Sequence, residues 1–257
     1  MTVNTVISVR NLVKKFGSFI ANDNLNFEVY EGEIFGFLGA NGAGKTTALR
    51  ILSGLSKPSS GEVKVAGFDA SREAEQIKKK IGYMCQKFSL YEDLTAKENI
   101  VLYGGIYGMS SSAIKKRTAE LLERLNFEQY QNRLISDLPL GVKQKLAFSV
   151  AVLHEPKIVF LDEPTGGVDP ITRRQFWEMI YETADRNITV FVTTHYMDEA
   201  EYCDRISIMN EGRIEAIDTP AELKRKYNAD SVEEVFVKIA RPAITQKGGL
   251  ETAVEQY

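Results

Sequence analysis

The sequence predicts an α/β fold with a parallel sheet core, an N-terminal antiparallel β subdomain and an inserted helical lobe. Three patterns lead to this prediction. Apolar and polar residues alternate in the first third of the chain, helical periodicity runs from about residue 94 to 154, and two apolar strands separated by a helix-length segment follow it. The last pattern is typical of βαβ units, which build parallel sheets.

The composition matches a soluble globular domain and excludes several classes of protein. Of the 257 residues, 44% are apolar and 26% charged, and 32 basic against 35 acidic side chains give a net charge of −3. Because this balance lacks a basic excess, no nucleic-acid partner is expected. Cys85 and Cys203 form neither a CxxC motif nor a ligand cluster, which favours a reducing cytosol. No apolar run reaches the roughly 18 to 20 residues that cross a bilayer, so any membrane role is expected to need a partner.

The first third of the chain is predicted to form strands that bury one face each. Leu25, Phe27 and Val29 alternate with polar residues, and the alternation returns at 63–65. The segment 33–38 is nearly all apolar and ends in a glycine-rich turn. It is therefore predicted to be a central strand covered on both sides.

A helical lobe is predicted at residues 87–154. Thr95 and Glu98 form a T-x-x-E capping box at the start of a helix. Apolar residues then recur at helical spacing between Ile114 and Leu125. The lobe interrupts a chain that otherwise reads as strands and connecting helices.

The remaining residues are expected to complete the sheet. Apolar strands at 158–161 and 189–192 flank a helix-length stretch at 171–185, and the turn at 210–212 indicates an edge hairpin. The expected domain therefore covers residues 1–240, with core and β subdomain at 1–86 and 155–225, the lobe, a C-terminal helix at about 230–240, and a flexible tail at 241–257.

A glycine-rich motif follows the first central strand. It fits G-x-x-x-x-G-K-[ST], and its residues are Gly39, Ala40, Asn41, Gly42, Ala43, Gly44, Lys45 and Thr46, with Thr47 continuing into a helix. In such a loop, backbone N–H groups surround nucleotide phosphates, the lysine supplies positive charge and the threonine hydroxyl helps to hold Mg²⁺. A purely structural turn is the alternative. The strand before the motif and the helix after it favour the phosphate site.

Two adjacent carboxylates end the strand at 158–161. Asp162 is predicted to be an acidic ligand of Mg²⁺, and Glu163 to orient or deprotonate an attacking water molecule. A solvated surface pair is the alternative reading. The buried strand before the pair and the phosphate loop elsewhere in the chain favour the functional one.

Four polar sites are predicted to meet at one edge of the sheet. Gly39, Gln86, Asp162 and His195 each follow the C-terminal end of a predicted strand, and those ends form the ligand crevice of an open parallel sheet. There the N–H of His195 can stabilise charge that develops on a γ-phosphate. A structural histidine, and for Gln86 a strand cap, are the alternatives.

Over residues 6–226, the order of these motifs resembles that of the ATP-binding subunit of ABC transporters. The order is a phosphate loop, a glutamine, a helical lobe, a signature-like stretch, an acidic pair, Asp169 and a histidine. The resemblance implies a P-loop NTPase core of the RecA type that binds ATP with Mg²⁺. The expected catalytic residues are Glu163, His195 and Lys45.

The resemblance also implies residue roles and partners. Phe16 would stack on adenine, unless it is a core residue, and Gln86 would join Thr46 and Asp162 at the metal and link it to a membrane partner. Two such chains, like or unlike, would enclose two ATP molecules, with Asp169 crossing the interface. A separate membrane permease would hold the cytoplasmic protein at the inner face of the cell membrane.

The signature stretch departs from the family pattern. Members usually read Leu-Ser-Gly-Gly-x-x-Gln, whereas residues 138–144 read Leu-Pro-Leu-Gly-Val-Lys-Gln. Two donors are lost, because Pro139 has neither a hydroxyl nor an N–H, and Leu140 does not easily adopt the positive φ open to glycine. Gly141 and Gln144 keep their places at the start of a helix expected to face the partner chain's γ-phosphate. This variant resembles a subclass of exporters for drugs, lipids or polymers.

The leading functional hypothesis is an ATPase subunit that dimerises on ATP and drives a separate permease, as an exporter. Phe88, Leu90 and Tyr91 are candidate contacts for that permease, with burial inside the helical lobe as the alternative. Two other functions stay open. One is a non-transport ABC-type ATPase acting as a conformational switch, and the other is an ATP sensor whose weak signature has cost it catalysis.

Overall fold

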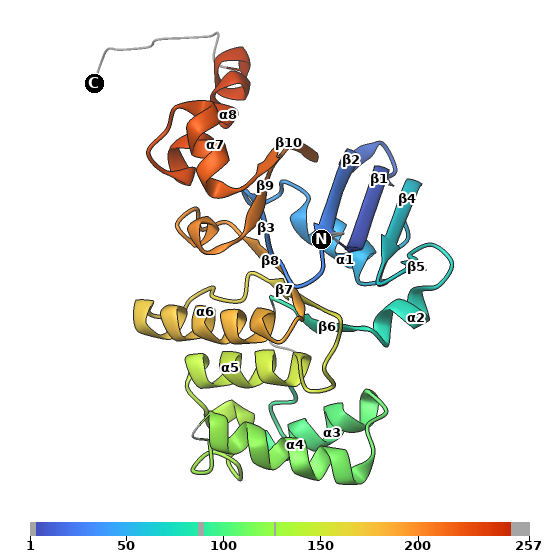
Figure 1. Ribbon diagram of the computed structural model, residues 1–257, viewed down its shortest axis with the longest axis vertical. Coiled ribbons are helices and arrows are strands. Elements are labelled where there is room, and N and C mark those ends of the chain that lie inside the picture. The colour runs from blue at the N-terminus through green and yellow to red at the C-terminus, as the bar shows by residue number, and fades with distance from the viewer. Residues whose placement is uncertain (1–3, 87–89, 126, 248–257) are drawn as a thin grey trace, which may run out of the picture.

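The computed structural model describes residues 4–86, 90–125 and 127–247, and it confirms the predicted three-part architecture. Figure 1 shows a sheet of N-terminal strands beside a second sheet that runs through the middle of the molecule, with helices α3, α4 and α5 in a lobe at the bottom. The two C-terminal helices lie at the opposite end, next to β9 and β10.

The N-terminal sheet is antiparallel, with strand order β2-β1-β4-β5. Its strands are β1 (Thr5–Phe16), β2 (Phe19–Tyr30), β4 (Ser60–Val65) and β5 (Phe68–Asp69). The predicted alternation is present, since Leu25, Phe27 and Val29 are buried whereas Asn26 is exposed. One face of this sheet therefore faces the core.

The central sheet has six strands in the order β10-β9-β3-β8-β7-β6, and all its pairings are parallel except that of β9 with β10. The strands are β3 (Ile34–Gly39), β6 (Ile81–Met84), β7 (Ile158–Asp162), β8 (Thr189–Thr194), β9 (Arg205–Asn210) and β10 (Arg213–Asp218). Strands β3, β7 and β8 are buried along their whole length, as expected for parallel strands covered on both faces.

The helices begin where the sequence supplies capping residues. Thr95 and Glu98 make the predicted capping box at α3, and Asp169 followed by Pro170 caps α6. The α-helices are α1 (Lys45–Leu52), α2 (Ala74–Lys78), α3 (Ala96–Ile106), α4 (Ser111–Arg124), α5 (Leu140–Ala151), α6 (Pro170–Asp185), α7 (Pro220–Tyr227) and α8 (Val232–Lys247), and two short 3₁₀ turns are η1 (Ile135–Asp137) and η2 (Glu199–Tyr202).

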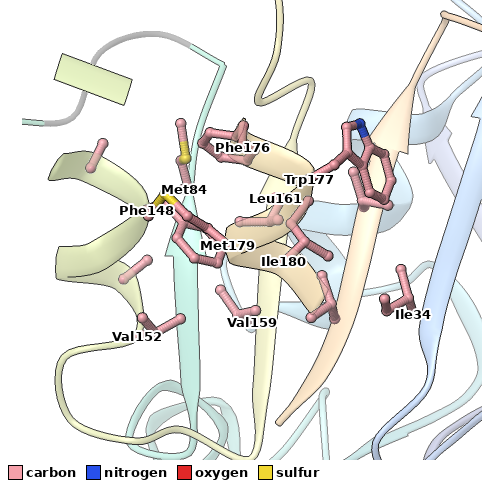
Figure 2. Close-up of a cluster of buried hydrophobic side chains, with 14 of the residues drawn as sticks. Ile34, Met84, Phe148, Val152, Val159, Leu161, Phe176, Trp177, Met179 and Ile180 are labelled. Carbon is pink, nitrogen blue, oxygen red and sulfur yellow. The ribbon is translucent and has the colours of Figure 1, made fainter. Parts of the chain in front are cut away.

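Two apolar clusters hold the layers together. Between the two sheets, Phe27, Phe35 and Phe37 surround Phe191, with ring centroids 5.3 to 6.3 Å from it. On the other face of the central sheet, side chains from α5 and α6 meet over β7 and β6, as Figure 2 shows for Phe148 and Phe176. Because both faces of the central sheet are covered, a ligand is expected to bind at the ends of its strands.

The C-terminal boundary differs from the prediction. The helix expected at about 230–240 is α8, which runs from Val232 to Lys247. Residues 241–247 of the expected flexible tail are therefore helical, and residues 248–257 lie outside the described part of the chain. The small and polar residues after Pro242 gave a sequence signal for a helix end, but Pro242 lies inside the helix.

Candidate functional site

The phosphate loop connects β3 to α1, and its glycines are required by the fold. Gly44, at the N-cap of α1, has φ +102°, and a Cβ atom there would lie 2.3 Å from the carbonyl oxygen of Ala21. Asn22, fully buried on β2, donates from Nδ2 to the carbonyl oxygen of Gly44 at 3.1 Å. The loop therefore lies directly against β2, and only glycine fits at its end.

Lys45 lies within the loop's own curve. Its side chain is 4% exposed, and Nζ donates to the carbonyl oxygens of Gly39 at 2.7 Å and Ala40 at 3.2 Å. Oε1 of Glu163 lies 3.5 Å from the same nitrogen. Burial lowers the pKa of Lys45, and the carboxylate of Glu163 opposes that shift. A charge-assisted donor is thus held at the strand end where a phosphate would lie.

Thr46 and Asp162 supply paired oxygen atoms. Thr46 Oγ1 lies 3.4 Å from Oδ1 of Asp162, and Thr193 Oγ1 donates to the same carboxylate oxygen at 2.6 Å. Asp162 is 2% exposed, and burial raises its pKa while the hydrogen bond from Thr193 opposes the shift. A hydroxyl beside a carboxylate is the oxygen donor set that suits Mg²⁺, so these two residues fit the expected cation.

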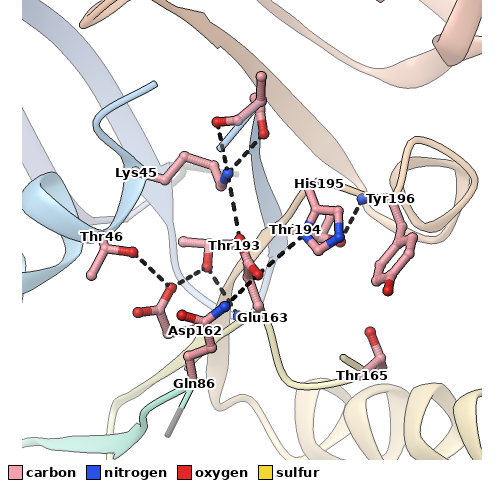
Figure 3. A network of polar contacts seen from close by, with 12 residues as sticks. Lys45, Thr46, Gln86, Asp162, Glu163, Thr165, Thr193, Thr194, His195 and Tyr196 are labelled. Atoms are coloured by element: carbon pink, nitrogen blue, oxygen red, sulfur yellow. Dashed lines mark hydrogen bonds and ion pairs between the residues drawn. The ribbon is translucent and has the colours of Figure 1, made fainter. Parts of the chain in front are cut away.

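Glu163 is the centre of the polar network in Figure 3. Its Oε2 accepts a hydrogen bond from Nε2 of Gln86 at 2.8 Å and lies 3.1 Å from Nδ1 of His195. Its backbone has φ +49°, an unfavourable conformation for a residue other than glycine, and its N–H donates to the carbonyl oxygen of Thr193 at 3.0 Å. Strain of this kind persists only where neighbouring contacts hold the residue, and it is frequent at functional sites.

The predicted convergence of four sites is confirmed. Gly39 and Asp162 are the last residues of β3 and β7, His195 follows β8 directly, and Gln86 lies two residues past β6. These four strands are neighbours in the order β3-β8-β7-β6. The amide nitrogen of Gln86 is bound to Glu163 here, and its role as a metal ligand stays a prediction.

The signature stretch lies near this edge without forming part of it. Leu140 is the first residue of α5, is 45% exposed and follows Pro139 at the N-cap. Gly141 packs against α6, where an added Cβ would lie 2.7 Å from Cγ2 of Thr172. Gln144 donates from Nε2 to the carbonyl oxygen of Gly166 at 3.1 Å, a contact within this chain.

A cleft of about 340 Å³ joins the two regions. It is lined by Gln86 and Glu163 on one side and by Leu140 and Gln144 on the other. The N-terminus of α5 thus opens onto the same space as the candidate base. This cleft therefore connects the signature stretch with Glu163 inside one chain.

Two further predicted residues have different outcomes. Asp169 caps α6, accepting from the N–H groups of Ile171 and Thr172, and the hydroxyl of Thr172 lowers its pKa. Phe16, at the end of β1, is 57% exposed, so the core alternative for it is wrong. Its ring lies 5.1 Å from Nζ of Lys14.

The predicted permease contacts differ in their exposure. Leu90 is 5% exposed and belongs to the core, so burial is the correct reading for it, whereas Tyr91 is 50% exposed. Phe88 lies outside the described residues. Within the described part of the chain, no helix has both the length and the apolar character needed to span a membrane.

Thr193 is a residue that the sequence reasoning missed. It stands opposite Asp162 in the parallel register of β7 and β8, and its hydroxyl contacts both members of the acidic pair. A signal was present, since a polar Thr193-Thr194 pair ends an otherwise apolar strand just before His195. Its function depends on strand register, which a single sequence does not specify.

Much of this site lies within a region that matches a known protein family. The sequence model of the family described as ABC transporter matches residues 22–166, more than half of the chain. The chain belongs to the ABC transporter family. The match begins at the end of β2 that supports the phosphate loop and includes both the loop and the acidic pair.

Several curated members of this family are similar along most of the chain. The probable multidrug ABC transporter ATP-binding protein YbhF of Escherichia coli (strain K12) is 44% identical over 240 residues, which are 91% of this chain and 42% of YbhF. The chain therefore spans about two fifths of that relative. The linearmycin resistance ATP-binding protein LnrL of Bacillus subtilis (strain 168) is 35% identical, over 90% of this chain and 75% of LnrL.

Solved ABC structures share the fold. An ATP-binding subunit of an ABC transporter superposes with a TM-score of 0.84 at 28% identity, covering 92% of this chain and all of that one. An ATP-binding cassette in a dimeric post-hydrolysis state bound to ADP and Pi gives a TM-score of 0.75 at 30% identity, covering 83% of this chain and 98% of the cassette.

Proposed function

We propose that this chain binds and hydrolyses ATP, pairs with a second ATPase subunit on binding it, and powers export through a separate membrane permease. The observation that carries the proposal is the placement of Glu163, with one carboxylate in reach of both His195 and Lys45 beside the Thr46–Asp162 pair. Family membership supports the same activity.

The chain's own groups have distinct tasks in this proposal. The N–H groups of the phosphate loop and Nζ of Lys45 bind the terminal phosphates, exchanging the carbonyl contacts of the free loop for phosphate oxygens. Thr46 and Asp162, with Gln86, would hold Mg²⁺, which would supply positive charge beside the phosphates.

The hydrolytic step is assigned to the groups around Glu163. Its carboxylate accepts a proton from the attacking water, and His195 donates to the phosphoryl oxygens on which charge develops. Before the water enters, Nε2 of Gln86 donates to Oε2 of this carboxylate at 2.8 Å. The ring of Phe16 is exposed and is proposed to stack on adenine.

The second ATPase subunit completes the site. Gly141 at the start of α5, Gln144 and Asp169 are proposed to face the nucleotide held by the partner, so that two chains enclose two ATP molecules. The dimeric cassette bound to ADP and Pi, which shares this fold, supports that arrangement. With Pro139 and Leu140 in place, the N-terminal backbone of α5 would supply the remaining donors.

The direction of transport is inferred from the relatives. Their names refer to multidrug transport and to linearmycin resistance, and the bacitracin transport ATP-binding protein BcrA of Bacillus licheniformis is 37% identical over 82% of this chain and 69% of BcrA. Drug-like compounds are therefore the proposed cargo, and export is the proposed direction. The permease would hold the chain at the cytoplasmic face of the cell membrane.

The test is recovery of the tagged chain from solubilised membranes of its own host, with identification of co-purifying proteins and an ATPase assay of the complex. We expect one multi-span membrane protein and Mg²⁺-dependent ATP hydrolysis. ATP hydrolysis without any membrane partner would replace transport with a conformational switch. Absence of hydrolysis in a complex that binds ATP would leave only a sensor.

A further inference from the structure

A buried carboxylate lies behind the candidate catalytic groups. Glu199, the first residue of η2, is fully buried. A carboxylate removed from water is tolerated only where hydrogen bonds and opposite charge satisfy it. The groups that satisfy this carboxylate therefore have to come from the segments packed around it.

Both oxygens of Glu199 are used, and each holds a different part of the site. Thr165 Oγ1 donates to Oε1 at 2.5 Å, and Thr194 Oγ1 donates to Oε2 at 2.7 Å. Nε of Arg173, on α6, lies 3.6 Å from Oε1 and supplies the opposite charge. Glu199 thus binds two hydroxyls that come from segments 29 residues apart in the sequence.

Those two hydroxyls flank the two groups assigned to hydrolysis. Thr165 lies two residues after Glu163, and Thr194 lies directly before His195, as Figure 3 shows. The carbonyl oxygen of Glu163 accepts the N–H of Gly166, which closes the turn that carries Thr165. Because the backbone of Glu163 is in the left-handed region, a fixed turn on its C-terminal side helps to keep it there.

The segment after His195 is fixed to the same side chains. The N–H of Tyr196 donates to Oγ1 of Thr194 at 3.0 Å, and the guanidinium of Arg173 lies 4.5 Å from the centroid of the Tyr196 ring. One hydroxyl therefore joins the backbone next to His195 to the carboxylate of Glu199.

We propose that Glu199 is a positioning residue for ATP hydrolysis, which fixes Glu163 and His195 relative to each other through Thr165 and Thr194. It lies outside the phosphate loop and is proposed to act on turnover while leaving ATP binding unchanged. The inference rests on the proposed roles of Glu163 and His195. A displacement of about 1 Å between reacting groups is enough to lower a rate about a hundredfold.

The test is Glu199→Gln in the full chain, with kcat and KM for ATP, the Kd for ATP and the melting temperature measured. Glutamine keeps the shape of the side chain, but its amide nitrogen replaces one acceptor oxygen, so only one of the two threonine hydroxyls can still donate to it, and the charge facing Arg173 is removed. We expect kcat to fall by about tenfold or more, with KM and Kd within about twofold of wild type. Glu201→Gln, two residues along in η2, is the matched control and should match wild type, because its contact is a partly exposed ion pair with Lys224.

Hydroxyl variants test the same contacts if the glutamine variant does not fold. Thr165→Val and Thr194→Val should lower kcat, and Thr165→Ser and Thr194→Ser should restore it, because serine keeps the donor that valine lacks. A kcat within about twofold of wild type in the valine variants would overturn the proposal.

A parallel assay of Glu163→Gln separates this inference from the proposed function. Loss of turnover in Glu163→Gln together with normal turnover in the Glu199 and threonine variants removes the positioning role alone. Normal turnover in Glu163→Gln removes the catalytic assignment on which the role depends.

Discussion

The phosphate-binding edge of the central sheet and the N-terminus of α5 differ in how their functional groups are held. At the sheet edge, Lys45, Asp162 and Glu163 are each 10% exposed or less and are bound by groups of the same chain. At α5, Leu140 is 45% exposed and the residue before it is a proline. One region is organised by its own contacts, whereas the other is an exposed surface with reduced donor capacity.

The largest effect is expected from a substitution of Lys45 at the phosphate-binding edge. Lys45→Ala removes the buried ammonium from the loop, and a charge-assisted contact is worth enough to lower ATP affinity by about a hundredfold. The measurement is ATP binding by calorimetry. Lys79→Ala, at an exposed lysine, is the control and should bind like wild type. Equal affinity in the two variants would mean that Lys45 does not contact phosphate.

A smaller loss is expected from the residue that supports the acidic pair. Thr193→Val keeps the shape of the side chain but removes the 2.6 Å hydrogen bond to Asp162 and one acceptor for the N–H of Glu163. We expect kcat to fall by about tenfold, with ATP affinity unchanged. Thr193→Ser restores the hydroxyl and should recover turnover. If the valine variant keeps wild-type kcat, Asp162 and Glu163 do not need this support.

The residues at the sheet edge could be predicted from the sequence because they follow strands. Gly39, Gln86, Asp162 and His195 were found because each follows the end of a predicted strand, and parallel strands bring their C-terminal ends to one edge. Local pattern and topology are enough for such residues. The same reasoning locates the capping box of α3 and the βαβ unit.

Residues that act through tertiary contacts were missed. Thr193 and Glu199 lie in ordinary positions of the sequence, and their roles depend on strand register and on a turn that returns to the core. The end of α8 was also misplaced, because Pro242 and the glycines after it suggest an earlier stop than the helix makes. Long-range packing decides these features, and no local pattern specifies it.

Two substitutions at the N-terminus of α5 are expected to raise ATP turnover. The double substitution Pro139→Ser and Leu140→Gly returns a hydroxyl and a permissive backbone to the signature stretch. We expect ATP turnover to rise about threefold, because the partner's γ-phosphate gains donors. Leu134→Gly, which removes another exposed leucine, should leave turnover unchanged. Unchanged turnover in the double variant would show that the helix N-terminus already supplies what this site needs.

The smallest expected effect concerns the connection between the helical lobe and the central sheet, at the C-terminal end of α5. Glu155, between α5 and β7, pairs with Arg117 of the lobe and with Arg186 after α6. The Arg117 guanidinium holds the pKa of Glu155 below its usual value. A lowered folded pKa means that the stabilisation is present above the unfolded value of 4.5 and is lost as the pH falls through the folded value.

Glu155→Gln should therefore lower the melting temperature by about 2 °C at pH 7, a small effect because the side chain is half exposed. The difference from wild type should disappear in scans at and below the folded pKa of Glu155. Glu182→Gln, whose carboxylate lies 4.0 Å from Arg124, is the control and should change less. A deficit that is constant with pH would assign the effect to packing.

The central claim is that Glu163 receives the proton of the attacking water in a site that binds ATP without its help. The most direct measurement is the fraction of bound radiolabelled ATP converted to ADP in a single turnover by Glu163→Gln and by wild type. We expect the variant to bind ATP and return it intact, whereas wild type returns ADP. Conversion at the wild-type rate by the variant would contradict this claim.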